Sequence, residues 1–380
     1  MIMKKYDAVV AGYICIDLIP DFKKTEVISK ISDIFRPGSL IEIDGLSFNL
    51  GGVVANTGLA LKKFEKRVFL NGLIGNDFVG KIILESLEKL DQSKGINTTH
   101  KSGTAFSIVV SPPGIDRIFL ESPGCSAIFD SSHINFEAIS QSRLFHFGYP
   151  PLLKQFYLNS GFQLYSLFSD IQKMNVVTSL DISLPDVSSE SGKVNWSDIL
   201  EKTLPYTDIF VPSIEEVLQI YKPDEYTKIR EKSFHADIID HIPVSLIREI
   251  GKNIIESGVK IVLIKAAHRG TYLLTGDIQD LNKKRGLNLS ENKWNHRELW
   301  CNAYPADPAK IKSATGAGDT AAAAFISAIL DGESPEDSLK YASIAGRNNL
   351  YIHNIFDELP DWSEMTKELK MSPNELICFD

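Results

Sequence analysis

One stretch constrains the fold more than any other: residues 314–325, which read Ala-Thr-Gly-Ala-Gly-Asp-Thr-Ala-Ala-Ala-Ala-Phe. The alanines after Asp319 favour a helix, and an acidic residue suits the first turn of a helix. The glycines before the helix leave several backbone N–H groups pointing in one direction, and the helix dipole adds positive potential there. We therefore expect residues 315–318 to form an anion cradle.

An aspartate beside a cradled phosphate calls for a functional explanation, because two negative charges repel each other. If a substrate hydroxyl enters between them, Asp319 can accept its proton while the oxygen attacks the terminal phosphorus. The cradle would stabilise charge on the phosphoryl oxygens. The same stretch also fits the pattern G-x-G-x-x-A, so a dinucleotide-binding oxidoreductase stays open as an alternative.

Outward from this stretch, apolar β-branched runs alternate with amphipathic helical patterns. Near-continuous apolar strands between helices indicate a mostly parallel sheet covered on both faces, which is a doubly wound α/β fold. The polar stretches 221–239 and 277–300 are interpreted as insertions or long surface loops. Strands are predicted at 8–16, 67–73, 106–110, 118–121, 144–147, 176–181, 209–212 and 260–264, and helices at 53–64, 78–90, 157–174, 214–219, 245–257, 319–330 and 336–349.

Two segments depart from this rhythm. Residues 39–50 and 103–122 alternate apolar and polar side chains, with Pro-Pro-Gly turn chemistry inside the second. Alternation with a period of two suits antiparallel strands that have one solvated face. We therefore expect a small β-sheet lid, built from about 14–50 and 102–123 and inserted in a single domain that spans 1–380.

A second glycine pattern lies near the N-terminus, where Gly51 and Gly52 precede Asn56 by a few residues. Paired glycines let the backbone approach a bound molecule closely, and an amide side chain both donates and accepts hydrogen bonds. These groups suit substrate hydroxyls better than phosphates. A third pattern, at 75–82, resembles a P-loop but has Ile82 where Mg²⁺ binding needs Ser or Thr, so it predicts only a turn into a helix at Phe78.

Composition excludes several classes of protein. The 380 residues are 43% hydrophobic and 23% charged, which is ordinary for a globular chain. The formal net charge of −9, without a long basic run, argues against nucleic acid or an anionic membrane as partner. No apolar run is long enough to span a bilayer. The four cysteines are widely spaced, which predicts neither a zinc site nor a disulfide scaffold and favours a reducing cytoplasm.

Together, the two glycine patterns resemble the signature motifs of the PfkB, or ribokinase-like, family of carbohydrate kinases. Gly51-Gly52-x-x-x-Asn56-x-x-x-Ala60 is similar to the N-terminal motif, and Ala314-Thr-Gly-Ala-Gly-Asp319-Thr is similar to the C-terminal one. The resemblance covers nearly the whole chain. It implies a ribokinase-like α/β body with a β-sheet lid, ATP as phosphoryl donor, and a divalent metal such as Mg²⁺.

The resemblance also implies roles for individual residues. Asp319 resembles the catalytic base, and the backbone of Thr315, Gly316, Ala317 and Gly318 resembles the anion hole. Asp17, Gly51, Gly52 and Asn56 match substrate contacts. Nucleotide contacts are implied for Lys265, Ala267, Gly270, Thr315 and Asn349, and a metal-organising role for Glu216.

Three positions depart from the family pattern. Ala267 replaces the first glycine of the nucleotide-binding turn, Ser213 replaces an asparagine three residues before Glu216, and Ser313 occupies a position often held by aspartate. The last two leave the metal arrangement and a monovalent-cation site in question. They also keep open a non-catalytic protein that binds sugar or nucleotide on the same fold.

The substrate is less constrained. Val53 and Val54 stand where relatives that bind phosphorylated sugars carry cationic chemistry, which favours an unphosphorylated sugar, sugar acid or, less strongly, a nucleoside. An inward-facing Arg117 on the lid would favour a sugar acid. Glu121, His146 and Tyr149 are further candidates for the pocket wall, and a homodimer through the lid is a family-level expectation.

Overall fold

The computed structural model describes residues 4–22, 30–112, 118–233, 237–285, 287–371 and 374–379, so Arg117 lies outside the described residues. Within these ranges one sheet has ten strands in the order β14-β13-β12-β11-β10-β9-β8-β1-β4-β5. The strands from β11 to β5 in this order run parallel, and β12, β13 and β14 run antiparallel to their neighbours. The bounds are β1 (Tyr6–Gly12), β4 (Val68–Gly75), β5 (Ile96–Thr99), β8 (Ser142–Gly148), β9 (Val177–Asp181), β10 (Ile209–Phe210), β11 (Ile261–Lys265), β12 (Thr271–Thr275), β13 (Glu298–Cys301) and β14 (Leu376–Cys378).

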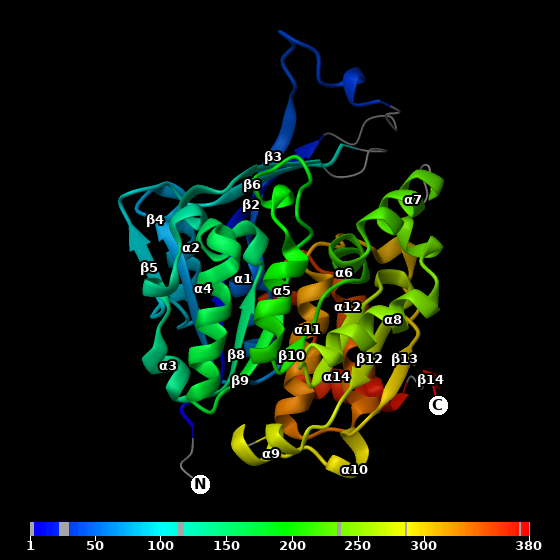
Figure 1. Ribbon diagram of the computed structural model, residues 1–380. Helices are drawn as coiled ribbons and strands as arrows, with labels where there is room; N and C mark the ends of the chain where they lie inside the picture. Colours follow the sequence, from blue (N-terminus) through cyan, green and yellow to red (C-terminus); the bar gives the residue numbers. More distant parts are fainter. Residues whose placement is uncertain are drawn as a thin grey trace.

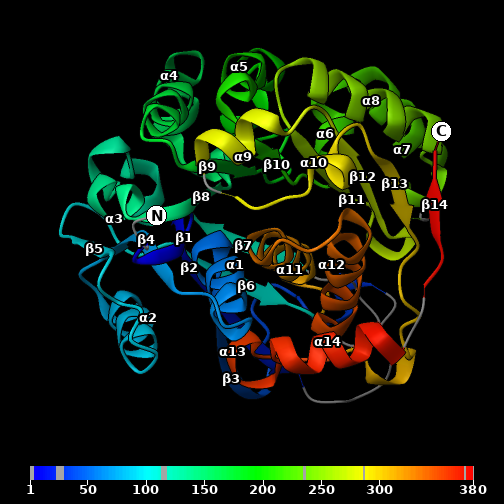
Figure 2. The same ribbon diagram turned by 90° about the horizontal axis from the view of Figure 1, so that it is seen from below.

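Helices cover both faces of this sheet (Figure 1, Figure 2). Successive strand residues alternate between the faces, so that Val10 packs into one apolar core and Val9 into the other. The predicted doubly wound, mostly parallel α/β fold is confirmed. One face carries α1 (Gly52–Lys63), α2 (Phe78–Glu88), α11 (Ala317–Asp331), α12 (Pro335–Asn349) and α14 (Trp362–Met371), and the other carries α3 (Phe136–Ser140), α4 (Lys154–Lys173), α5 (Trp196–Thr203), α6 (Ile214–Tyr221) and α8 (Val244–Glu256).

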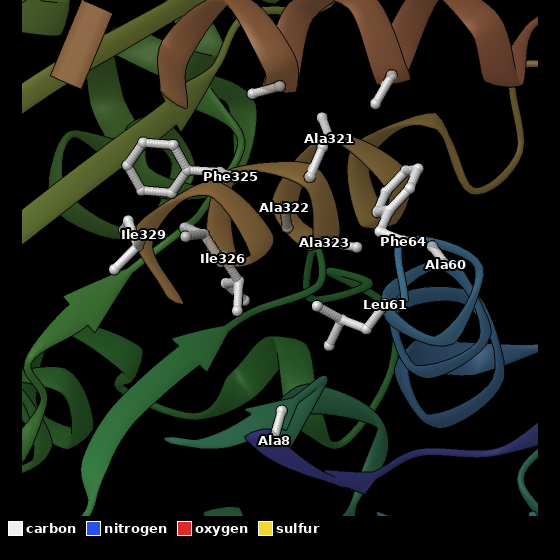
Figure 3. Packing of buried hydrophobic residues seen from close by; sticks show 14 of the residues in the cluster. Ala8, Ala60, Leu61, Phe64, Ala321, Ala322, Ala323, Phe325, Ile326 and Ile329 are labelled. Carbon is white, nitrogen blue, oxygen red and sulfur yellow. The ribbon is translucent and has the colours of Figure 1, made fainter. Parts of the chain in front are cut away.

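The packing of α1 against α11 brings the two glycine motifs together, although they are far apart in the sequence (Figure 3). The side of α11 that the alanine run supplies is fully buried against α1 and the sheet. Alanine side chains are short, so the two helix backbones can approach closely. Larger groups close the remaining space, among them Leu61, Phe64, Phe325 and Ile329.

The first predicted strand, 8–16, is wrong as a single element. The chain leaves the large sheet at Gly12 and enters a second sheet at Cys15, so that the apolar run is divided between β1 and β2 (Cys15–Phe22). Gly12 has a φ of 129°, and a Cβ there would lie 2.3 Å from the carbonyl oxygen of Gly148. A residue with a side chain cannot take this bend, and composition alone does not reveal it.

The second sheet has four strands among the described residues, in the order β3-β2-β6-β7. The expectation of a small sheet separate from the main body is confirmed, whereas its action as a lid stays a prediction. It lies over one end of the α/β body (Figure 1). Its remaining strands are β3 (Ile43–Gly51), β6 (Phe106–Val110) and β7 (Ile118–Ser122).

The interpretation of the two polar stretches as loops is wrong. The first contains α7 (Pro223–Ser233), and the second contains α9 (Gln279–Arg285), α10 (Glu291–Trp294) and most of β13. These elements are short and mostly polar, so they are stabilised by tertiary contacts rather than by a strong apolar stripe. Among the helices of the described ranges, none combines the length and apolarity needed to cross a bilayer.

We predict that Gly12→Ala lowers the free energy of unfolding by more than about 2 kcal/mol, because the added Cβ meets the backbone of β8 and φ is positive. Urea denaturation followed by circular dichroism measures this loss. The control is Gly45→Ala, since a Cβ at Gly45 meets nothing within 4 Å. Equal stability of the two variants would contradict the hinge geometry.

Candidate active site

A cavity of about 560 Å³ lies between the small sheet and the body of the protein. The small sheet contributes Asp17 and Asn49 to its wall, and α1 contributes Asn56. The loop before α11 contributes Thr315. Two of the predicted substrate residues, Asp17 and Asn56, therefore share one cavity with Thr315 of the predicted anion cradle.

Asp319 lies in the first turn of α11 and is 4% exposed. Three side chains donate hydrogen bonds to its carboxylate. Asn56 Nδ2 lies 3.0 Å from Oδ2, Thr57 Oγ1 lies 3.2 Å from Oδ1, and the hydroxyl of Tyr149 also donates to Oδ1. Asn56 also lines the cavity. The Asp319 carboxylate therefore lies one side chain away from the space that a substrate would enter.

Tyr149 takes an unusual backbone conformation to reach Asp319. Its φ and ψ are 62° and 51°, in the left-handed region, and the next residue is Pro150. A left-handed conformation is unfavourable for a residue other than glycine, and a following proline restricts the backbone further. Such backbone strain persists only where the surrounding structure holds the residue in place. Burial raises the pKa of the Tyr149 hydroxyl well above its ordinary value, and the charge of Asp319 adds to this effect. The hydroxyl therefore stays protonated and donates.

The cradle before α11 is formed by a left-handed turn at Gly316, where φ is 79°. Two of its amides are used internally, since Thr315 N–H donates to Ser313 Oγ and Ala317 N–H to the carbonyl of Ala314. Within the described part of the chain, the N–H groups of Gly316, Gly318 and Asp319 have no acceptor. Two of these three N–H groups, those of Gly316 and Gly318, belong to the predicted range 315–318, and the binding of an anion there stays a prediction.

Asn349, at the end of α12, holds this turn in place. Its Nδ2 donates to the carbonyl of Thr315 at 2.8 Å, and its Oδ1 accepts from Thr320 Oγ1 at 2.8 Å. Both ends of the amide are therefore used by the chain itself, although the residue also lines the cavity. The contact with adenine that the resemblance implied remains untested.

Lys265, at the end of β11, lies mostly buried beside the turn before α11. Its ammonium group lies 2.8 and 3.0 Å from the carboxylate oxygens of Asp181, and a Cβ on Gly318 would lie 3.7 Å from it. Burial lowers the pKa of Lys265, but the carboxylates of Asp181 and Glu216 outweigh it and the net pKa is raised. The lysine therefore keeps its positive charge beside the turn before α11.

Glu216 belongs to a capping box at the start of α6. Its carboxylate accepts from the backbone N–H of Ser213 at 2.7 Å, and the hydroxyl of Ser213 accepts from its N–H at 3.3 Å. Ser213 therefore replaces the family's asparagine with an intact helix cap. Burial raises the pKa of Glu216, and the charge of Lys265 opposes that shift.

The described residues contain no cluster of three or more His, Cys, Asp or Glu suited to a metal ion.

The turn after Lys265 has the backbone shape of a glycine turn although it carries an alanine. Ala267 has a φ of 45°, in the left-handed region, and Gly270 has a φ of 112°. The alanine that departs from the family pattern is thus held in a strained conformation that glycine would take without cost.

Asp17 is the third residue of β2 in the small sheet, and not the end of the first strand as the sequence suggested. Gly51 makes room for it, because a Cβ at Gly51 would lie 3.0 Å from Asp17 Oδ2. Gly52, with a φ of 80°, begins α1. Burial raises the pKa of Asp17 to about 6, while hydrogen bonds from Ser107 and Cys15 oppose the shift.

His146, which the sequence suggested for the pocket wall, lies in the core instead. His146 is fully buried, with Nδ1 2.9 Å from Ser179 Oγ, and burial lowers its pKa to about 3. It is a core residue and not part of the cavity wall.

Sequence reasoning missed Thr57 and Asp181. Asp181 does close a predicted strand, and that position alone could have suggested it.

Comparison with known proteins agrees with this geometry. Residues 5–349 match the family described as pfkB family carbohydrate kinase. The chain belongs to the pfkB family of carbohydrate kinases. Membership of this kinase family disfavours the dinucleotide-binding alternative for residues 314–325.

Relatives within the pfkB family carry several names. The chain is 22% identical over 388 residues to 5-dehydro-2-deoxygluconokinase of Clostridium botulinum, covering 99% of this chain and 97% of the relative. It is 23% identical over 326 residues to ribokinase of Arabidopsis thaliana, covering 85% of this chain and 72% of the relative. Among solved structures, Arabidopsis thaliana ribokinase complexed with ribose and ATP has a TM-score of 0.68 at 18% identity, covering 97% of this chain and 99% of that one.

We predict that Ala267→Gly raises the free energy of unfolding by up to about 1 kcal/mol, because glycine takes the left-handed conformation without strain. Thermal denaturation at matched protein concentration measures the change. The matched control is Ala266→Gly, whose parent residue is fully buried at a φ of −118° and gains nothing from glycine. A loss of stability in both variants would argue against strain at Ala267.

Proposed function

We propose that the protein transfers the γ-phosphoryl group of ATP to a hydroxyl of a small sugar or sugar-like substrate. One observation carries the proposal. The carboxylate of Asp319 is held by three donors at the start of α11 and contacts Asn56 of the cavity wall. It lies beside three N–H groups that have no acceptor among the residues the structure describes. A base and an anion site thus lie next to one another at a cavity of sufficient size for a sugar.

In this mechanism Asp319 accepts the proton of the substrate hydroxyl as its oxygen bonds to the γ-phosphorus, and ADP leaves with the electrons of the broken P–O bond. Thr57 and Tyr149 both donate to Oδ1, whereas Oδ2 receives only Asn56 among the described residues. Oδ2 is therefore the oxygen with more free capacity to take the proton. The N–H groups of Gly316, Gly318 and Asp319 would stabilise the phosphoryl oxygens.

Lys265 supplies a buried positive charge for the phosphates, and Asp181 fixes its position. We propose Glu216 as the carboxylate that organises the water around Mg²⁺. Bound with ATP, Mg²⁺ neutralises part of the phosphate charge. The lack of a carboxylate cage among the described residues suits this ion, because Mg²⁺ usually keeps several waters and uses one or two carboxylates with substrate phosphates.

The names of the relatives leave two substrate classes. Ribokinase and fructokinase names denote neutral sugars, and 5-dehydro-2-deoxygluconokinase denotes a gluconate derivative. A solved structure at 16% identity is named as an archaeal nucleoside kinase, which supports only the fold. Release of ADP in the presence of a substrate separates the kinase from a protein that only binds sugar or nucleotide.

We further propose a cytoplasmic enzyme that acts as a homodimer through the small sheet and does not bind nucleic acid. The four cysteines without disulfide bonds support a cytoplasmic location, and the net charge of −9 argues against binding to nucleic acid. The dimer is supported by exposed apolar side chains on the outer face of the small sheet, where Leu46 is 61% and Leu120 is 55% exposed. A second copy of the sheet would cover both.

We predict that Asp319→Asn lowers kcat by a factor of about 10³ or more, because the amide cannot accept the hydroxyl proton. Affinity for a non-hydrolysable ATP analogue, measured by isothermal titration calorimetry, changes little. Asp331→Asn, at the other end of α11, is the control and keeps full activity, since Asp331 pairs with Lys66 and lies far from the first turn. Retention of kcat in the Asp319 variant would remove its role as base.

For the dimer, we expect the wild-type chain to have twice the monomer mass by light scattering coupled to size-exclusion chromatography. Leu46→Asp and Leu120→Asp would each shift the mass toward the monomer, because a charge would be buried at the contact. The control is Met371→Asp, because Met371 is 81% exposed on α14, away from the small sheet. A monomeric wild-type protein would contradict the proposal.

A further inference from the structure

The two oxygens of the Asp319 carboxylate are hydrogen-bonded unequally. Thr57 Oγ1 donates to Oδ1 from α1 at 3.2 Å, and the hydroxyl of Tyr149 donates to the same oxygen from the turn after β8. Among the described residues, Oδ2 accepts only from Asn56 of α1. A carboxylate oxygen offers about two lone-pair sites for hydrogen bonds. The two hydroxyls therefore fill Oδ1, and Oδ2 keeps one site for a further donor.

Tyr149 reaches the carboxylate without reaching the substrate space. Asn56 is part of the described wall of the 560 Å³ cavity, and Tyr149 is not. The expectation that Tyr149 forms part of this wall is therefore wrong. Burial and the charge of Asp319 raise the pKa of its hydroxyl, so that it donates to Oδ1 and keeps its own proton.

The surrounding structure holds Tyr149 through both its backbone and its ring. The backbone is left-handed, with φ 62° and ψ 51°, which is costly for a residue with a side chain. The ring centroid lies 6.5 Å from that of Tyr13. The hydroxyl of Tyr13 donates to Glu121 Oε1 of β7 at 3.0 Å, and Glu121 itself is exposed and outside the described cavity wall. The strained backbone is therefore compensated by contacts that direct the Tyr149 hydroxyl to Asp319.

We propose that Tyr149, together with Thr57, is a positioning residue for the base. The two hydroxyls hold Oδ1 in place, so that Oδ2 presents its one open acceptor site to the substrate hydroxyl. Rotation of the carboxylate would break both hydrogen bonds at once, and the oxygen that takes the proton is thus chosen before the substrate arrives. The inference rests on the proposed kinase function. It adds Tyr149, which lies outside both glycine motifs.

The experiment measures ADP release by the full-length protein with D-ribose, D-fructose, D-gluconate and 5-dehydro-2-deoxygluconate as probes. With the best probe, Tyr149→Phe removes only the hydroxyl and should lower kcat about 10- to 100-fold, because Oδ1 loses one of its two donors. KM for that probe and Kd for a non-hydrolysable ATP analogue should change less than about threefold, since Tyr149 touches neither ligand. The stoichiometry of analogue binding corrects kcat for any unfolded fraction.

A double-mutant cycle distinguishes positioning from direct action on the reaction. In the Asp319→Asn background, Tyr149→Phe should change the residual kcat less than about threefold, because the hydroxyl acts only through the carboxylate. Effects that multiply would show that Tyr149 acts by itself and would overturn the proposal. Tyr341→Phe is the matched control. Tyr341 is 2% exposed, and its hydroxyl lies 3.0 Å from Thr366 Oγ1, so the variant loses a hydrogen bond away from Asp319 and keeps kcat.

Thr57 provides a second test at the same oxygen. Thr57→Val removes the other donor to Oδ1 and should lower kcat in the same range, whereas Thr57→Ser keeps a hydroxyl and should retain most of the wild-type kcat. If Tyr149→Phe fails to fold, this pair decides. Equal kcat values for the Val and Ser variants would then overturn the proposal.

The results separate the positioning role from the kinase function. An unchanged kcat in folded Tyr149→Phe, or a rise in KM larger than the fall in kcat, would overturn the positioning role while the kinase function stands. No ADP release by the wild-type protein with any probe would overturn the kinase function instead. Urea denaturation then tests the hydrogen bond by itself: Tyr149→Phe should lower the unfolding midpoint in the wild-type background and much less in the Asp319→Asn background.

Discussion

The structure depends on the hydrogen bonds that three side chains donate to one buried carboxylate, that of Asp319. A nearly inaccessible charge is costly unless it is fully hydrogen-bonded, and Asn56, Thr57 and Tyr149 meet this requirement from two other elements. The donors come from α1 and from the turn after β8. Loss of this packing would leave the charge without partners, so site geometry and fold stability are linked.

The alanine run of α11 explains how such a contact can form. Short side chains bring α1 and α11 close together (Figure 3). Asn56 and Thr57 of α1 can therefore donate to Asp319 in the first turn of α11. The backbone strain at Tyr149 is a cost borne by the same contact. Ala267 shows comparable strain in the neighbouring turn beside Lys265. Strained residues thus lie on both sides of the candidate site, beside Asp319 and beside Lys265.

Much of the fold could be predicted from hydrophobic periodicity, because buried parallel strands and amphipathic helices leave strong local signals. The predictions failed where the signal is not local. The run 8–16 looks like one strand, and only the close approach of Gly12 to Gly148 shows that it bends into a second sheet. Helices α7 and α9 are polar and short, and therefore gave no apolar stripe to detect.

The α/β class, a glycine turn before α11 and the assignment of the two glycine motifs to one candidate site all follow from the sequence alone. These are encoded by residue type and order. Tertiary structure decided which groups meet: Tyr149 with Asp319, Asp181 with Lys265, and Asn49 with Asp17 across the small sheet. The physical reason is that hydrogen bonds and ion pairs between distant segments depend on strand register and helix packing, which no local pattern records.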